Sequence, residues 1–305
     1  MPFKISSITN NLPEPPAFRV FWFEDNNPLT RTSKKRRISA PNKGMRVIHK
    51  RMIGQLRSAV LPYGLMKAAT GCRRNDSPRR NVQIHVRHRY FFATDIHSAY
   101  LSVDGRKLVQ ILREIFELSD DYDQLDLFLE ILPVFMEKYF LDENGGLRIG
   151  GPASPDLFNI YAAVVLDNPL QKLCEKYRLT YTRYLDDLIF SADEPIGNKK
   201  RRAIRQAIAD SGFQINYRKT QVIDLKKQPI EINGIGLAWP NRIFLPRHFL
   251  SKIHGLIYRA MSRGDVPPEK VHGYMGVFWS VSGRGPFNRT ERKVLKLYYD
   301  YSRLI

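Results

Sequence analysis

The chain has 305 residues, of which 49 are Lys or Arg and 30 are Asp or Glu, so its formal net charge is +19. A hydrophobic fraction of 43% supports a packed core and excludes a wholly disordered chain. The sequence has no apolar run of about 18 residues and no apolar leader segment, so we expect no membrane span and no membrane partner. Two cysteines, Cys72 and Cys174, are too few for a disulfide framework. We therefore expect a cytoplasmic protein, and the positive charge predicts a polyanionic partner, most often nucleic acid.

Basic residues are concentrated in two blocks, at 31–57 and 73–89, whereas acidic residues gather at 114–126. Apolar residues interrupt the first block at intervals, which is typical of folded elements rather than of a disordered tail. A nucleic-acid surface is favoured for these blocks, and a plain solvated face is the alternative.

The apolar pattern predicts a mixed α/β chain. A basic β-hairpin is expected at 33–41, followed by a helix at 45–62 and a buried strand at 89–95. The later expected elements are helices at 104–118, 121–139 and 155–177, a hairpin at 179–193, a basic helix at 197–211, short strands within 213–238, and a basic helical tail from 246 that is broken at 267–268 and 283–286.

Three carboxylates carry the predicted chemistry. Asp95 ends an apolar strand, and Asp186 and Asp187 are adjacent in the turn of an apolar hairpin. A mostly buried carboxylate cluster is costly unless cations neutralise it, and Mg²⁺ prefers oxygen ligands. Two such ions about 3.5–4 Å apart can assist phosphoryl transfer. An isolated Asp-Asp pair is often only a turn, but its place between apolar strands favours a metal site.

The segment Tyr184–Asp187 (YLDD) resembles the YxDD box of reverse transcriptases. Further boxes follow the order of that family, and the similar span is roughly 20–260. These boxes are 36–41 (RRISAP), 91–100 (FFATDIHSAY), 147–155 (LRIGGPASP), 212–220 (GFQINYRKT) and 232–236 (INGIG). A chance match to any single box would carry little weight, whereas five boxes in order carry much more.

The resemblance implies a set of site residues. Asp95, Asp186 and Asp187 would bind two Mg²⁺ ions, replaceable by Mn²⁺, with the carbonyl of Ile96 as a further ligand. The implied nucleotide-binding residues are Arg36 at the triphosphate, Tyr100 beneath the sugar, Gly150 in the template loop, and Lys219, which is also implied to act in catalysis at the pyrophosphate. Alternatives stay open, since Lys34, Lys35 or Arg37 could share the role of Arg36. Tyr100 could be a core aromatic, and Lys219 could be a solvated lysine.

Within that family, the sequence resembles the bacterial retron-type enzymes. Asn81 to His85 (NVQIH) is similar to their NAxxH box, and Ile232 to Gly234 (ING) matches their VTG box only at the glycine. The resemblance implies that Asn81 and His85 bind RNA; alternatively, they satisfy each other's buried hydrogen bonds. Two departures are Arg148-Ile149 in place of Pro-Gln, and Leu185 in place of the more common Ala.

Basic residues in the tail predict contacts with a nucleic-acid backbone. Arg289, Arg292, Lys293 and Lys296 are assigned to RNA binding, because they gather beside apolar residues in a predicted helix. A helical cap on the rest of the fold is the alternative. Asp156 and Asp167 are interpreted as helix-face or capping acids outside the site.

Together these features predict an α+β, right-hand polymerase fold with an antiparallel palm sheet. The expected divisions are fingers with N-terminal helices at 1–88, palm at 89–240 with packing helices at about 104–140, and helical thumb at 241–305. The resemblance implies an RNA-directed DNA polymerase, a nucleotidyltransferase that copies a structured noncoding RNA in a retron antiviral defence system. Its implied partners are that RNA, the DNA product, dNTPs and an effector protein. Alternatives are another defence-associated reverse transcriptase with template-independent or protein-primed synthesis, and a catalytically silent RNA-binding scaffold.

Overall fold

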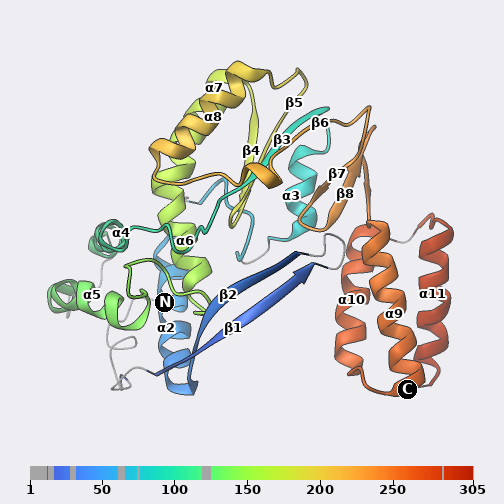
Figure 1. Cartoon of the computed structure of the whole chain (residues 1–305), viewed down its shortest axis with the longest axis horizontal. Helices are drawn as coiled ribbons and strands as arrows, with labels where there is room; N and C mark the ends of the chain where they lie inside the picture. Colours follow the sequence, from blue (N-terminus) through green and yellow to red (C-terminus); the bar gives the residue numbers. More distant parts are fainter. Residues whose placement is uncertain are drawn as a thin grey trace.

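The computed structural model describes residues 12, 17–27, 32–60, 66–73, 76–118, 125–283 and 285–304, with the backbone alone at 25–27, 32–34 and 58–60. The described chain contains a two-stranded hairpin, a four-stranded central sheet, a three-stranded sheet and the helices that cover them (Figure 1). Of the N-terminal helices expected within 1–88, the structure describes those at 43–60 and 78–85, and residues 1–11 and 13–16 lie outside the described residues. Within the described part of the chain, no helix is long and apolar enough to cross a membrane.

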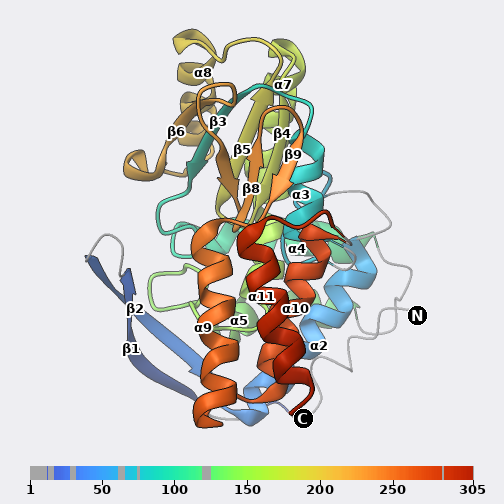
Figure 2. The same cartoon turned by 90° about the vertical axis from the view of Figure 1, so that its right-hand side faces the viewer.

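A long antiparallel hairpin projects from the body of the protein (Figures 1 and 2). Its strands are β1 (Phe18–Asn27) and β2 (Thr32–Pro41). The prediction of a complete hairpin within 33–41 was wrong, because that segment is a single strand paired with the aromatic-rich segment before it. Helix α2 (Lys43–Val60) follows at once and buries Met45, Ile48 and Met52, whose spacing of three and four residues places them on one face.

The central sheet carries the predicted carboxylates. Its strand order is β4-β5-β3-β6, and its described pairs are all antiparallel. The strands are β3 (Tyr90–Asp95), β4 (Thr180–Tyr184), β5 (Asp187–Ala192) and β6 (Gln221–Asp224). Both faces are covered, because Phe91 and Phe92, which point to opposite faces, are each 0% exposed.

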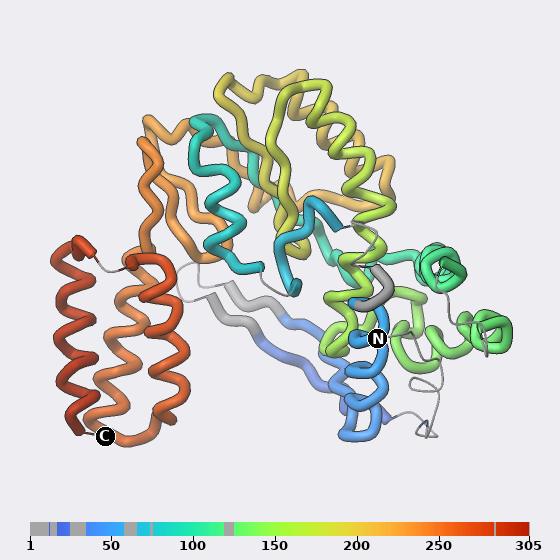
Figure 3. The backbone as a smooth tube through the Cα atoms, turned by 180° about the vertical axis from the view of Figure 1, so that it is seen from behind, coloured from blue at the N-terminus to red at the C-terminus, as the bar shows by residue number. Residues whose placement is uncertain are grey.

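One face of the sheet packs against a long helical rod. The rod is continuous in the backbone trace (Figure 3) and consists of α6 (Ser154–Ala162), the π-helical turn η2 (Ala163–Asp167) and α7 (Asn168–Tyr177). The sequence predicted it as one helix, and the structure adds the π turn. Helix α8 (Asn198–Asp210) packs beside α7.

The other face is covered by α3 (Pro78–His85) and the second sheet. That sheet consists of β7 (Ile230–Ile232), β8 (Ile235–Ala238) and β9 (Arg242–Phe244). Residues of this layer share a hydrophobic cluster with Phe91 and Ile189 of the central sheet. The short turn η3 (Tyr217–Lys219) precedes β6.

The peripheral helices confirm most of the periodicity predictions. Helix α4 (Gly105–Glu117) begins after Asp104, whose carboxylate caps the backbone N–H groups of Arg106 and Lys107, and it packs against α5 (Leu125–Tyr139). The tail forms three helices side by side (Figure 2), which are α9 (Arg247–Arg263), α10 (Pro268–Ser282) and α11 (Arg289–Ser302). The breaks between them coincide with the two predicted interruptions. The division into fingers, palm and thumb stays a prediction.

Candidate active site

Asp95, Asp186 and Asp187 meet at one end of the central sheet. Asp95 is the last residue of β3 and lies directly opposite Asp187, the first residue of β5, while Asp186 lies in the turn before β5. One carboxylate oxygen of each lies within 4.8 Å of the others, and no other group of three metal-ligating side chains is found among the described residues. The predicted convergence of these three side chains is therefore present.

The electrostatics of this carboxylate cluster fit a bound cation. Burial and the neighbouring Asp186 and Asp95 carboxylates raise the pKa of Asp187 to about 7. Burial, followed by the charge of Asp95, also raises the pKa of Asp186. The mutual repulsion that raises these pKa values is what a divalent cation would relieve, so the donor set fits a hard metal ion.

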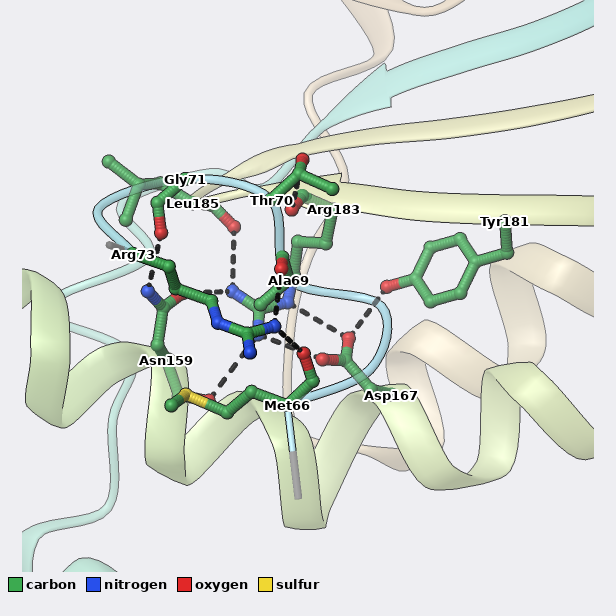
Figure 4. A network of polar contacts seen from close by, with 10 residues as sticks. All are labelled: Met66, Ala69, Thr70, Gly71, Arg73, Asn159, Asp167, Tyr181, Arg183 and Leu185. Atoms are coloured by element: carbon green, nitrogen blue, oxygen red, sulfur yellow. Dashed lines mark hydrogen bonds and ion pairs between the residues drawn. The ribbon is translucent and has the colours of Figure 1, made fainter. Parts of the chain in front are cut away.

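A buried ion pair beneath the turn fixes its conformation. Leu185 has a φ of 56°, which is uncommon for a leucine, and its carbonyl accepts a 3.2 Å hydrogen bond from Arg183 Nη1. Arg183, which is 0% exposed, also donates to both carboxylate oxygens of Asp167 at 2.9 and 2.8 Å (Figure 4). Asp167, interpreted from the sequence as a helix-face or capping acid, makes no side-chain cap; it is buried at the end of the π turn and neutralises Arg183.

Two further side chains complete this network beneath the turn. Asn159 accepts a 2.8 Å hydrogen bond from Arg183 and donates a 2.9 Å bond to the Gly71 carbonyl, and the Tyr181 hydroxyl donates to Asp167. The loop at 66–73 is held against β4 because the backbone N–H of Thr70 donates to the Arg183 carbonyl. Figure 4 shows these contacts converging on Arg183 from three segments of the chain.

Asp95 is held by residues on the segment that leads into β6. Lys219 Nζ lies 3.0 Å from Asp95 Oδ1, and Asn216 Nδ2 donates a 3.2 Å hydrogen bond to Asp95 Oδ2. Lys219 thus lies at the carboxylate cluster, and its predicted role at the pyrophosphate stays a prediction. Asn216 was not predicted as a site residue, although its place in the Gly-Phe-x-Ile-Asn segment was a usable signal.

A pocket of about 410 Å³ opens beside the cluster. It is lined by Asp95 and Asp186, by Lys219 and Asn216, by residues 96–101 including Ile96 and Tyr100, and by hairpin residues Trp22, Lys35, Arg36 and Arg37. Arg36 lies close enough for its charge to lower the pKa of Asp186, against the larger upward effect of burial. Trp22 was not predicted to line the site, because the strand that carries it was not predicted.

Of the predicted nucleotide-binding residues, Tyr100 lines the pocket, whereas Gly150 is not among the residues that line it. The Tyr100 ring packs edge-on against Phe158 at 5.4 Å between centroids. Gly150 instead lies against β2, where an added Cβ would come within 2.8 Å of Ile38. With a φ of 102°, Gly150 is required for the approach of its loop to the hairpin.

Asn81 and His85 require a correction. Both side chains are 0% exposed, so a direct contact of either with RNA is contradicted by their burial. They satisfy buried hydrogen bonds instead, through Thr182, which donates to Asn81 Oδ1 at 2.5 Å and lies 2.7 Å from His85 Nε2. The four basic residues of α11, in contrast, are exposed and line a shared hollow of about 490 Å³; they are Arg289, Arg292, Lys293 and Lys296.

The family model described as "Reverse transcriptase (RNA-dependent DNA polymerase)" matches residues 24–237. The chain belongs to the reverse transcriptase family. Its curated relatives include the retron Mx65 reverse transcriptase of Myxococcus xanthus, 25% identical over 249 residues, and the retron Ec73 reverse transcriptase of Escherichia coli, 26% identical over 217 residues. These alignments cover 79% and 66% of this chain but only 57% and 66% of the two relatives. The predicted relationship to retron-type reverse transcriptases is confirmed.

Solved structures show the same fold. Telomerase from Candida albicans, in complex with a TWJ fragment of telomeric RNA, matches with a TM-score of 0.55 and 15% identity over 98% of this chain and 59% of that chain. Telomerase from Candida tropicalis, with the corresponding RNA fragment, gives a TM-score of 0.51 and 13% identity over 93% and 57%. The predicted α+β right-hand polymerase fold is confirmed, and at these identities the likeness concerns the fold alone.

Proposed function

We propose that this protein is an RNA-directed DNA polymerase, a nucleotidyltransferase that extends a primer with dNTPs on a structured noncoding RNA. The observation that carries the proposal is the carboxylate cluster of Asp95, Asp186 and Asp187 beside a pocket with basic hairpin residues. Membership of the reverse transcriptase family supports the same chemistry. Neither alternative from the sequence, another defence-associated enzyme or a silent scaffold, is favoured by the relatives.

The three carboxylates and the Ile96 carbonyl would hold Mg²⁺, with Mn²⁺ as a substitute. Bound divalent ions would activate the primer hydroxyl and balance charge on the phosphates. Lys219 and Arg36 would supply positive charge at the triphosphate, because both residues line the pocket. Tyr100 would close the space beneath the sugar from the pocket wall.

The same proposal assigns the fingers, palm and thumb and a biological setting. The hairpin and α2 belong to the fingers, the central sheet to the palm and α9–α11 to the thumb. The exposed basic residues of α11 fit an RNA backbone, whose phosphates attract Lys and Arg without reading sequence. By analogy with its retron relatives, the protein would act in the cytoplasm, in an antiviral defence system with its own RNA, the DNA product and an effector protein.

Primer extension by the purified protein tests this proposal. With Mg²⁺, dNTPs and an annealed RNA template, the wild type should add nucleotides that copy the template, and Asp95→Asn should not. Extension that ignores the template sequence would favour template-independent synthesis. A wild-type protein that binds RNA but adds no nucleotide would favour the scaffold alternative.

A further inference from the structure

A chain of side-chain hydrogen bonds runs from the back of the central sheet to the carboxylate cluster. Asn233 Nδ2 donates to Asp187 Oδ2 at 3.0 Å, and Asn81 Nδ2 donates to Asn233 Oδ1 at 2.6 Å. Thr182 donates to Asn81 Oδ1 at 2.5 Å. Behind Thr182 lies the ring of His85, whose two nitrogens lie 2.7 Å from Thr182 Oγ1 and Ser191 Oγ. This series of hydrogen bonds therefore links α3, β4 and the β7–β8 turn to Asp187.

The direction of every hydrogen bond follows from the donor and acceptor atoms that meet along this series of side chains. Asp187 Oδ2 accepts from the amide nitrogen of Asn233, which therefore turns its own oxygen toward Asn81. Asn81 must then donate to Asn233, which leaves its own oxygen to accept from the single hydroxyl proton of Thr182. Thr182 in turn accepts from the Nε2–H of His85.

The protonation of His85 agrees with this direction of donation. Burial lowers the pKa of His85 to about 3, so its ring is neutral and carries one proton, on Nε2. Its bare Nδ1 accepts from the Ser191 hydroxyl, whose oxygen in turn accepts from His88 Nδ1 at 2.7 Å. In all six hydrogen bonds the donor therefore lies on the side away from Asp187. His85 and Asn81 are each 0% exposed, so water does not reach the middle of the series.

We infer that Asn233 and Asn81 are positioning residues that orient the Asp187 carboxylate for metal binding, with Thr182 and His85 fixing the orientation of their amides. This inference rests on the proposed function, and it concerns residues that lie behind the cluster rather than in the pocket. Asp187 faces two like charges, from Asp186 and Asp95, and the Asn233 N–H opposes their repulsion. The left-handed conformation of Asn233, with a φ of 49°, directs this side chain from a tight turn, and asparagine tolerates that conformation better than most residues.

Direct binding of Mn²⁺, followed by electron paramagnetic resonance on the full chain without nucleic acid, tests the inference. Asn233→Gly removes the donor and keeps a backbone that glycine adopts readily, and Asn81→Leu removes the next link at similar volume. Asn233→Gly should bind Mn²⁺ about 10- to 100-fold more weakly than the wild type, which is the usual effect of losing a partner of a metal ligand. Asn81→Leu should weaken Mn²⁺ binding in the same direction by a smaller factor. Both should also require correspondingly more Mn²⁺ for primer extension.

Two controls separate positioning from stability. Asn241→Gly changes the same residue type in the same left-handed conformation, with a φ of 59°, at an exposed turn, and should bind Mn²⁺ like the wild type. Thr182→Val should weaken Mn²⁺ binding less than Asn81→Leu, and Thr182→Ser, which keeps the hydroxyl, should restore it. The thermal unfolding of each variant shows whether it is folded.

The inference is overturned if folded Asn233→Gly and Asn81→Leu variants bind Mn²⁺ as tightly as the wild type and need no more of it for extension. Failure of the proposed function has a different signature. A wild-type protein that binds Mn²⁺ through the carboxylate cluster, but extends no primer on RNA, would refute the polymerase proposal and leave the positioning roles intact.

Discussion

Arg183 and Asp167 form a fully buried, two-bond ion pair beneath the turn that carries Asp186. The guanidinium donates to both carboxylate oxygens, and the two side chains are 0% and 2% exposed. The same guanidinium also binds the carbonyl of Leu185, the residue before Asp186. The Arg183 charge, which holds the turn through the Leu185 carbonyl, is thus neutralised by Asp167. That residue lies sixteen positions earlier in the sequence, at the end of the π turn.

Removing one partner of this pair should strongly destabilise the protein. Asp167→Asn leaves the buried Arg183 charge uncompensated, and we expect the free energy of unfolding to fall by about 3–5 kcal/mol. Denaturant titration measures this difference. The matched control is Asp156→Asn, which breaks an ion pair with the half-exposed Arg57 and should cost about 1 kcal/mol or less. Equal losses in the two variants would contradict the structural importance of the buried pair.

Neutralising the carboxylate cluster should abolish activity while sparing the fold. The double substitution Asp186→Asn with Asp187→Asn removes two charges and little volume, so nucleotide incorporation on a primer–template should fall to background. Far-ultraviolet circular dichroism should be unchanged. Undiminished DNA synthesis by this variant would refute the assignment of the metal site.

The same cluster predicts how stability varies with pH without divalent ions. The pKa of Asp187 is raised from its ordinary value of 3.8 to about 7, so the folded state binds a proton more tightly than the unfolded state. Its contribution to stability is therefore greatest below pH 4 and is lost as the pH rises toward 7. Asp187→Asn removes this dependence, so the stability of the variant relative to the wild type should increase across that range. Thermal unfolding in a chelator measures it, and a constant difference would contradict the raised pKa.

The sequence revealed the local patterns better than the long-range contacts. Helices such as α2 and α4 have strong apolar periodicity, and the three aspartates were identified because each follows or precedes an apolar strand. The buried pair was missed, because Asp167 lies in an apolar helix and nothing local indicates that Arg183 lies against it. The sequence left the burial of Asn81 open as an alternative to RNA binding, but it could not indicate the partners Thr182 and Asn233, because they are distant in sequence.

Removing the ring of Tyr100 should weaken discrimination against ribonucleotides. Tyr100 lines the pocket and packs against Phe158, and the proposed function assigns it to the space beneath the sugar. Tyr100→Ala should therefore incorporate rNTPs more readily without a matching loss of dNTP use. Tyr100→Phe keeps the ring and should discriminate like the wild type. Comparing kcat/KM for dNTP and rNTP measures the effect, and an unchanged ratio in Tyr100→Ala would identify Tyr100 as a packing residue only.

The basic residues of α11 should govern the salt dependence of RNA binding. Arg289, Arg292, Lys293 and Lys296 are exposed and line one hollow, so all four can reach a phosphate backbone. Replacing all four by Gln should reduce the magnitude of the slope of log K against log salt concentration by about 0.7 to 0.9 for each phosphate that the variant no longer neutralises. The reduction in affinity should be greatest at low salt.

A charge-matched variant separates this specific surface from the general effect of a net charge of +19. Replacing Lys199, Lys200, Arg201 and Arg202 of α8 by Gln removes the same number of charges from a helix that packs beside α7, on another part of the fold. It should change the slope less than the α11 variant does. The carboxylate cluster stands on separate strands, so the α11 variant should still extend a preannealed primer–template at saturating enzyme. Equal slopes for the wild type and the α11 variant would mean that these four residues face solvent in the complex, and would direct the search for the RNA surface to 73–89.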